Sequence, residues 1–422
     1  MIYNRGMLIH SATQLLTLAG GPQRGNELGH LGLLQDGAVL VRGERIEAVG
    51  PSADLRAAYP DEPEFNAQGC VVLPGFVDPH THLVWAGDRA HEFEMRLQGK
   101  TYMEIMAAGG GIVSTVQATR AASPEELLAQ TRSRAETMFR YGTTTAEAKT
   151  GYGLDTQAEL KQMSVLLALD EEGPMEIAPT FLGAHALPIE YRDNPEGYVR
   201  EVCETMLPSL LNWWPQHASG RPLPFVDVFC ETGAFDLDQS RRILETAARA
   251  GFPLKIHADE FDNLGGARLA ANLNAASADH LVTTSASDIQ ALAASDTMAV
   301  ALPCTPFGLA DAHYTPAQEI LANGGLLAVA SDINPGTAWC ESMQLVIALA
   351  CRYLRLTPAQ AIAAATINAA AAIQRADRIG SLEPGKQADL LILSVNDYRH
   401  LGYRFGSNLV QAVIKRGKIY PV

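Results

Sequence analysis

Eight short apolar segments alternate with helical segments between residues 70 and 332, and this alternation restricts the possible folds of the 422-residue chain more than any other feature. The eight segments are CVVLPGFVDPH, TTTAEAKTG, MEIAPTFLGAH, FVDVFCE, PLKIHAD, SADHLV, TMAVALP and LLAVASD. Strands that alternate with helices pair in parallel, and eight such units close into a (β/α)₈ barrel. We therefore predict an α/β fold built on a TIM-like barrel.

The segments between the strands carry helix signals. One of them begins at Ser123 and has Pro124 in its first turn and Glu126 three residues after the serine, which is the pattern of a capping box. It reaches Gly142, and glycine commonly ends helices. The segments DLDQSRRILETAARAG and TPAQEILANGG repeat this pattern with their own glycine stops. These features predict the helices that a barrel of this kind requires.

The two ends of the chain differ from the middle. Residues 1–70 and 379–422 contain short apolar segments separated by Gly and Pro, without a strong helical period, which is typical of strands. Two β-rich ends around one long middle predict that the ends pair into a single small β-sandwich domain. Residues 71–378 would then form the catalytic barrel.

Composition excludes several classes of partner. The formal net charge is -15 and no run of Lys or Arg stands out, so we expect neither nucleic acid nor a membrane as a partner. The first residues lack the apolar core of a signal peptide, and no apolar stretch reaches membrane-spanning length. The six cysteines are scattered and include no CxxC pair, which favours reduced thiols in a cytoplasmic protein.

Polar side chains that can do chemistry stand at the downstream ends of most predicted strands. These residues are His82, Lys149, His185, Glu231, His257, His280 and Asp332. In (β/α)₈ barrels the carboxyl ends of the strands form the active-site face. Because unrelated polar residues would be scattered along the strands, we predict that this face of the barrel is catalytic.

Four of the strand-end residues suggest a metal site. His80 and His82 are two residues apart, so on a strand they point to the same side, although such a pair alone can also be a hydrogen-bonded core feature. His257 closes another strand, and Asp332 follows the last one. A buried aspartate without a partner is costly, and three imidazoles with one carboxylate suit zinc or a similar divalent ion.

Other residues near this face have two interpretations each. His280 is either a hydrogen-bonded core histidine or a base that holds a metal-bound water, and His185 is similar. Glu260 either faces the pocket or solvates a loop, and Arg89 would ordinarily be a surface residue. Tyr152 lies in a glycine-rich loop after a strand, where ligand contacts are common.

The sequence predicts no catalytic role for Lys149, for the glycine-rich segment 107–115 or for Cys304. Lys149 has none that follows from the sequence. The glycine-rich segment 107–115 lacks the ending of a phosphate-binding loop, so we expect a flexible loop over the barrel mouth. Nothing in the sequence lowers the pKa of Cys304, so we treat it as structural.

The strings PGFVDPHTHL, KIHADE, SADHL and ASD closely resemble the amidohydrolase superfamily, whose members are metal-dependent hydrolases built on a (β/α)₈ barrel with a small β-sandwich. The resemblance covers essentially the whole chain, including GSLEPGKQADLLIL near its end. Further strings, among them GDRAHEFEMRLQGKTYMEI, AKTGYGLD, TFLGAHALP and ASDINPG, are similar to a branch that acts in L-histidine degradation. This implies hydrolysis of the cyclic amide of 4-imidazolone-5-propanoate to N-formimino-L-glutamate.

The resemblance also implies roles for individual residues. One metal ion per chain, zinc or iron, would be held by His80, His82, His257 and Asp332. The substrate would be contacted by Arg89, Tyr152, His185 and Glu260, with Asn334, Gly336 and Thr337 near the carboxylate end of the product. His280 and Asp332 would orient the attacking water and accept its proton. His185 would polarise the ring carbonyl, and Glu260 would hydrogen-bond the ring nitrogens and help to protonate the leaving one. The family also favours a homodimer.

Three points remain open at this stage. The strand that ends FVDVFCETG carries Glu231 and no lysine, which argues for one metal, although Glu231 could bridge a second. The loop with Cys304 and Pro306 departs from the wording usual in the family, which leaves its shape undetermined. The alternatives to this function are a mononuclear deaminase of nucleobase-like rings in the same superfamily and a non-catalytic interaction protein on the same scaffold. Arg89 argues against the deaminase because nucleobases carry no carboxylate.

Overall fold

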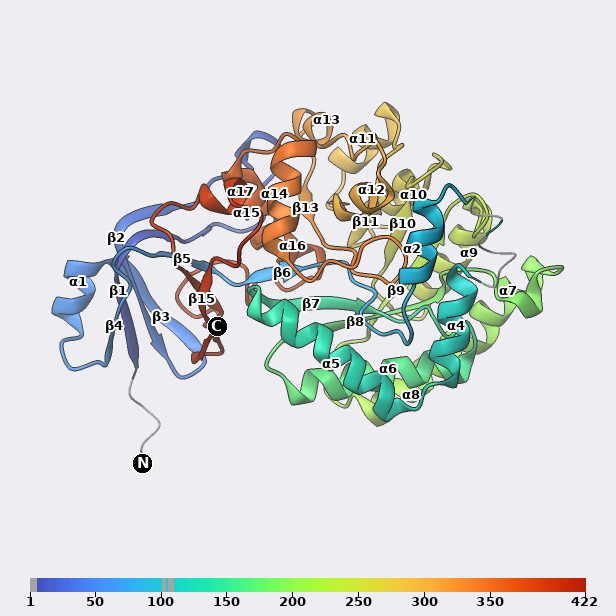
Figure 1. The fold of residues 1–422 in the computed structure, drawn as a ribbon, viewed down its shortest axis with the longest axis horizontal. Helices are drawn as coiled ribbons and strands as arrows, with labels where there is room; N and C mark the ends of the chain where they lie inside the picture. Colours follow the sequence, from blue (N-terminus) through green and yellow to red (C-terminus); the bar gives the residue numbers. More distant parts are fainter. Residues whose placement is uncertain (1–5, 101–103, 105–109) are drawn as a thin grey trace.

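The computed structural model describes residues 6–100, 104 and 110–422, and its larger part is a barrel of eight parallel strands (Figure 1). Neighbouring strands pair in chain order. The strands are β6 (Phe76–Asp78), β7 (Thr143–Lys149), β8 (Glu176–Ala184), β9 (Phe225–Cys230), β10 (Lys255–Ala258), β11 (Ser277–His280), β12 (Met298–Ala301) and β13 (Leu327–Val329). A parallel bridge between Thr81 and Ile333 links the segments that follow β6 and β13. The predicted barrel is therefore confirmed, with all eight predicted strands in it.

Helices surround the barrel and connect its strands (Figure 1). They are α2 (Ala90–Leu97), α4 (Ile112–Ala121), α5 (Pro124–Arg140), α6 (Thr156–Glu172), α7 (Pro195–Glu201), α8 (Leu207–His217), α9 (Leu237–Arg249), α10 (Gly266–Asn272), α11 (Ala286–Ala293), α12 (Cys304–Leu309), α13 (Ala317–Ala322), α14 (Met343–Tyr353), α15 (Pro358–Ala364), α16 (Ile367–Ala372) and the short α17 (His400–Tyr403). The capping box predicted for α5 is present, because Ser123 and Glu126 exchange side-chain and backbone hydrogen bonds. No helix in the described part of the chain is long and apolar enough to cross a membrane.

The two ends of the chain form one separate sheet beside the barrel (Figure 1). Its strands are β1 (Met7–Leu16), β2 (Leu33–Arg42), β3 (Arg45–Pro51), β4 (Glu64–Asn66), β5 (Val71–Pro74), β14 (Leu390–Leu393), β15 (Val410–Lys415) and β16 (Lys418–Pro421), with helix α1 (Ser52–Ala58) beside β1 to β3. Antiparallel pairing of β14 with β5 joins the C-terminal segment to the N-terminal one, as the composition of the two ends predicted. Most neighbouring pairs are antiparallel, whereas β1 runs parallel to β4 and β5.

The stretch predicted as the first barrel strand is in fact two strands in two sheets. β5 pairs in the small sheet, whereas β6 pairs with β7 in the barrel. Pro74 cannot donate a ladder hydrogen bond, and a side chain at Gly75 would place its Cβ 2.3 Å from the hydroxyl oxygen of Thr144. The proline-glycine pair therefore ends one strand and lets the backbone pass close to β7 into the other.

The glycine-rich segment 107–115 was predicted to be a loop over the barrel mouth. Residues 107–109 lie outside the described residues, and helix α4 already begins at Ile112. Gly111 precedes this helix with a φ of +78°, a conformation that glycine adopts without strain. The loop prediction is therefore wrong for residues 112–115.

Candidate metal centre and substrate pocket

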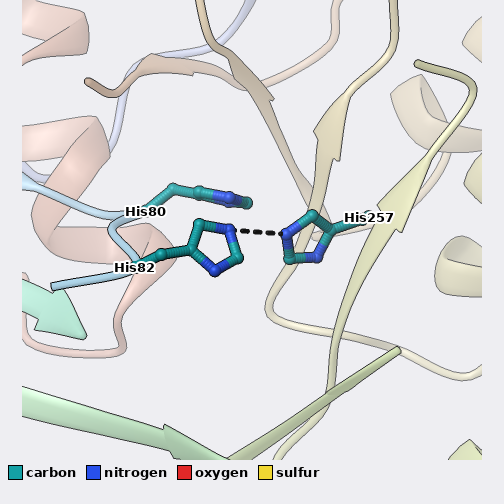
Figure 2. A group of neighbouring side chains, drawn as sticks. All are labelled: His80, His82 and His257. Carbon is teal, nitrogen blue, oxygen red and sulfur yellow. Dashed lines mark hydrogen bonds between the residues drawn. The ribbon is translucent and has the colours of Figure 1, made fainter. Parts of the chain in front are cut away.

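The structure brings the four predicted metal ligands together. His80 and His82 follow β6, His257 lies in β10 and Asp332 follows β13. The Nε2 atoms of His82 and His257 are 3.2 Å apart, and Figure 2 shows the three histidine rings converging on one point. Oδ1 of Asp332 lies 3.4 Å from Nε2 of His80 and 3.5 Å from Nε2 of His82. All four side chains are buried.

The hydrogen bonds of these histidines fit a metal ion. Nδ1 of His80 lies 2.6 Å from Asp279 and Nδ1 of His257 lies 3.0 Å from Asp227, so each ring donates its Nδ1 proton to a carboxylate and keeps a lone pair on Nε2. Nε2 of His80 and Oδ1 of Asp332 are buried and have no hydrogen-bond partner within residues 6–100, 104 and 110–422. Lone pairs that face one another with no proton between them are what a bound cation satisfies.

Burial lowers the pKa of His80 and of His82 well below the ordinary value for histidine, and neighbouring cationic groups lower it further. Both rings are therefore neutral at neutral pH, which is the state in which imidazole binds a metal. His80 forms a second close group with His280 and Asp332. The site thus offers neutral nitrogen and carboxylate ligands from several strand ends.

A buried charged layer lies beneath the ligands, and the sequence analysis missed its role. Nζ of Lys149 lies 2.7 Å from Glu147 and 2.9 Å from Asp227, and Nζ of Lys255 lies 3.7 Å from Asp279. Burial lowers the pKa of Lys149, but the facing carboxylates outweigh this effect and hold the pKa above its ordinary value. The lysine thus fixes the carboxylate that orients His257. The sequence signal for this layer was a charged residue inside each of four largely apolar strands: Lys149, Asp227, Lys255 and Asp279.

His280 and Glu260 lie beside the ligands. Nδ1 of His280 is 3.6 Å from Oε2 of Glu260, and Nε2 of His280 has no hydrogen-bond partner in the described residues. Burial lowers the pKa of His280 well below its ordinary value. Burial and the nearby carboxylate of Asp332 raise the pKa of Glu260 well above its ordinary value. The pair therefore combines a neutral imidazole with a carboxyl group that holds its proton more tightly than an exposed glutamate does.

His185 and Tyr152 form another wall of the site. The ring of His185 stacks on that of His82 with centroids 4.8 Å apart, and the Tyr152 ring lies 5.2 Å from His185. Nδ1 of His185 is 3.0 Å from the carbonyl oxygen of Gly151. A carbonyl only accepts, so Nδ1 carries the proton and Nε2 is an acceptor. Burial and the nearby His257 lower the pKa of His185 to about 3, so the ring is neutral.

The residues predicted to lie near a carboxylate also come together. Oδ1 of Asn334 accepts hydrogen bonds from the backbone amides of Gly336 and Thr337, each at 2.8 Å, which closes a tight turn after β13. A Cβ atom built on Gly336 would lie 2.5 Å from Nη1 of Arg89, so the guanidinium packs against this turn. Arg89 therefore lies against the turn that follows the strand of Asp332, with its side chain 19% exposed and paired with Glu92.

The segment of undetermined shape forms helix α12 and reaches the metal site. The Thr305 hydroxyl donates a hydrogen bond to Oδ2 of Asp332. Cys304 is buried, and a hydrogen bond with Cys340 together with burial raises the pKa of its thiol well above the ordinary value, in agreement with a structural role. Pro306 is buried in the same helix. Thr305 is a further residue that the sequence analysis missed.

Glu231 does not face the metal ligands as a bridge would. Its carboxylate accepts hydrogen bonds from the backbone amides of Phe261 at 2.9 Å and Asp262 at 3.1 Å, and also from that of Thr232. It belongs to neither group of candidate ligands found among the described residues. Glu231 instead anchors the loop that follows β10, which carries Glu260.

Comparisons with known proteins agree with this geometry. The profile of the amidohydrolase family matches residues 71–420, and that of the imidazolonepropionase-like composite domain of bacteria matches residues 37–61. The chain is 51% identical to the imidazolonepropionase of Herpetosiphon aurantiacus, over 98% of this chain and 96% of that protein. It is 49% identical to the imidazolonepropionase of Chloroflexus aggregans, over 98% of each.

Solved structures share the fold at lower identity. A zinc-containing adenosine deaminase from Xanthomonas campestris superposes with a TM-score of 0.69 at 20% identity, over 99% of this chain and 93% of that one. A triazine hydrolase variant superposes with a TM-score of 0.73 at 16% identity, over 99% and 96% of the two chains. These likenesses show the architecture of barrel and small sheet.

Proposed function

The chain belongs to the amidohydrolase family and, within it, to the imidazolonepropionases, and from this premise we propose how its site hydrolyses 4-imidazolone-5-propanoate to N-formimino-L-glutamate in L-histidine degradation. The observation that carries the assignment is the full-length identity of 51% to an imidazolonepropionase. The pocket supports it, because a guanidinium, Arg89, packs against the turn that follows the strand of ligand Asp332. A carboxylate-bearing ring fits such a pocket.

We propose one metal ion per chain, zinc or iron, held by His80, His82, His257 and Asp332. The converging unpartnered atoms of this group support a metal, and the occupied carboxylate of Glu231 supports a single one. A divalent ion held by these residues would lower the pKa of a bound water to about 7 and would so supply a nucleophile at neutral pH. Elemental analysis of the purified protein should give about one equivalent, and two equivalents would contradict the proposal.

Three side chains handle the protons of the ring opening. His280 is neutral and has a free Nε2, so it can accept the proton of the attacking water, and Asp332 orients that water through Oδ1. The raised pKa of Glu260 favours its protonated form, which can donate to the ring nitrogen that leaves as the amide bond breaks. The carbon–nitrogen bond breaks as water adds its oxygen to the carbonyl carbon. One proton of the water passes to His280, the leaving nitrogen takes its proton from Glu260, the other proton of the water leaves with the new carboxyl group, and transfer from His280 to Glu260, 3.6 Å away, restores both side chains.

Substrate binding uses the two walls of the pocket. Arg89 holds the propanoate group, and the turn made by Asn334, Gly336 and Thr337 supports that end of the substrate. Tyr152 contacts the ring from the other side, beside His185.

The tautomer of His185 in the structure supports a different role from the one predicted. The sequence analysis expected His185 to polarise the ring carbonyl, which requires a proton on Nε2. Because the proton of the neutral ring is donated to Gly151, we propose that Nε2 instead accepts a hydrogen bond from a ring N–H of the substrate.

Direct turnover tests this function. Purified protein should hydrolyse imidazolone propanoate, measured as the loss of its absorbance, and should act far more slowly on guanine, cytosine and adenosine. Deamination of one of these rings with no action on imidazolone propanoate would favour the deaminase alternative. A non-catalytic scaffold has no need for the buried groups His80–His82–His257 and His80–His280–Asp332, which argues against that alternative.

Location and assembly are further parts of the proposal. Six free cysteines among the described residues support a reducing, cytoplasmic environment. Resemblance to the family supports a homodimer. Light scattering on the purified protein should give twice the chain mass of 45.3 kDa, and a monomer would contradict this.

A further inference from the structure

Helix α2 and the residue before it carry a cluster of three charged side chains, two of which contact the turn at Gly336. Arg89, Glu92 and Arg96 are three and four residues apart, a spacing that places them on one face of a helix. Two guanidiniums and one carboxylate leave this face with a net charge of one positive unit. That charge matches a ligand with a single carboxylate, on a chain whose formal net charge is -15.

Glu92 is held between this helix and the next one. Its Oε2 accepts a hydrogen bond from Nε of Arg89 at 2.8 Å. Its Oε1 accepts from the backbone amide of Gly111 at 3.0 Å and from the Ser114 hydroxyl at 3.2 Å, at the start of α4 (Figure 1). Only 9% of Glu92 is exposed. A carboxylate fixed at both oxygens in this way gives the guanidinium one defined orientation.

The two Nη groups of Arg89 lie at the Gly336 turn and are not used by Glu92. Nε is used by Glu92, and the two Nη atoms have no hydrogen-bond partner in the described residues. Gly336 leaves room for Nη1, because a Cβ atom there would lie 2.5 Å from it. Nη2 of Arg96 donates to the carbonyl oxygen of Gly336 at 3.0 Å and so ties the same turn to α2.

We propose that Glu92 is the positioning residue of a carboxylate subsite: it fixes Arg89 through Nε so that both Nη groups face the carboxylate of the substrate, while Arg96 holds the Gly336 turn against them. The inference rests on the proposed function and adds to it the residues that orient the arginine. Glu92 acts only through Arg89, so its contribution should depend on that side chain.

A double-mutant cycle tests this dependence. Glu92→Ala should raise KM for imidazolone propanoate about tenfold or more, with kcat changed less than about threefold, since the lost contacts bind the non-reacting end of the substrate. In the Arg89→Ala background, Glu92→Ala should change KM less than about twofold, because contacting residues are not additive. An equal effect in both backgrounds, or an unchanged KM in Glu92→Ala alone, would overturn the proposal.

Matched controls separate positioning from a general loss of structure. Glu94→Ala removes the same charge from an exposed position of α2 and should leave KM within about twofold. Ser114→Ala removes one bond to Glu92 but keeps its pair with Arg89, so KM should rise less than in Glu92→Ala. Metal content should be the same in every variant, because none of these residues belongs to the ligand group.

A binding readout keeps the inference independent of turnover. Imidazole propanoate, an unreactive carboxylate probe, should bind to the wild type and about tenfold more weakly to Glu92→Ala in calorimetry. If the wild type binds this probe in a Glu92-dependent way but hydrolyses no imidazolone propanoate, the proposed function fails and the subsite stands. If turnover occurs and neither KM nor probe binding depends on Glu92, the function stands and the subsite fails.

Discussion

The two ends of strand β8 show two ways to bury polar groups. At its first residue, Glu176 is 6% exposed and accepts hydrogen bonds from Arg375, Arg378, Lys415, Gln387 and Arg416. Just beyond its last residue, His185 stacks on His82 of the candidate metal site, where several buried atoms have no hydrogen-bond partner among the described residues. The polar groups are buried to a similar extent at both ends, but only those at Glu176 have their hydrogen-bond partners within the described part of the protein.

The difference separates stability from function. A carboxylate surrounded by cations is satisfied by the protein itself, and because Lys415 lies in β15, the cluster fastens the small sheet to the barrel. Buried lone pairs without partners reduce stability in the free protein and are retained where a ligand will satisfy them. We therefore expect substitutions in the Glu176 cluster, at the amino ends of the barrel strands, to affect stability. Substitutions at the carboxyl ends of the strands should affect metal binding and activity.

The sharpest test of this comparison is His82→Ala. We expect kcat/KM to fall at least about a thousandfold, because the chemistry supplied by the metal is lost. The free energy of unfolding of the metal-free protein should fall less than in Glu176→Ala, since the neutral His82 ring gives up only its Nε2 contact with His257 and its packing, and its Nδ1 has no hydrogen-bond partner among the described residues. Activity assays, elemental analysis and denaturation with a chelator present measure these quantities. If His82→Ala keeps its metal and its activity but unfolds readily, His82 serves stability and not function, which would contradict the comparison.

Glu176→Ala tests the amino end of the strand. Removing the carboxylate leaves several buried cations unpaired, so the free energy of unfolding should fall by about 3–5 kcal/mol. The folded fraction should keep its metal and its kcat/KM within about threefold, because the cluster lies at the opposite end of the barrel from the ligands. Denaturant titration and turnover at low temperature provide the measurement. Loss of metal with unchanged stability would contradict the comparison.

Asp279→Asn tests the carboxylates behind the ligands. Asp279 accepts the Nδ1 proton of His80 and thereby orients its ring. Metal affinity should fall about 10- to 100-fold, which is less than the loss of a ligand causes. Competition with a chelator of known affinity measures this change, and an unchanged affinity would mean that His80 keeps its orientation without Asp279.

The pH dependence of stability gives the smallest expected effect. Burial raises the pKa of Glu176, but Lys415, Arg375 and Arg378 outweigh it and hold this pKa well below the ordinary value. The stabilisation is therefore present above the ordinary glutamate pKa and is lost as the pH falls below it. Between pH 7 and pH 3 the wild type should lose more stability than Glu176→Gln does. Parallel curves for the two proteins would exclude this contribution.

The strands, and the gathering of the polar side chains at their ends, were predictable because each has a local signal. Apolar segments of strand length mark the barrel, and His80, His82, His257 and Asp332 each stand at the end of such a segment. The division at Pro74 was missed, because a strand that changes sheets has the same apolar pattern as a single long strand.

The partners of the site residues could not be predicted because they depend on how distant segments meet. Lys149 reaches Asp227 from a different strand, and Thr305 reaches Asp332 only because α12 folds over the end of the barrel. The cluster at Glu176 needs residues that lie about 200 positions later in the chain, such as Arg375. Such contacts arise only when the barrel closes and the C-terminal segment pairs with the N-terminal strands of the small sheet. No local sequence pattern encodes either event.

The most direct test of the central claim is the turnover of imidazolone propanoate before and after metal removal. Chelator-treated protein should lose its activity, and about one equivalent of zinc or iron per chain should restore it. The His82→Ala variant, treated in the same way, should stay inactive after metal is added. Full turnover by wild-type protein from which elemental analysis detects no remaining metal would contradict the account.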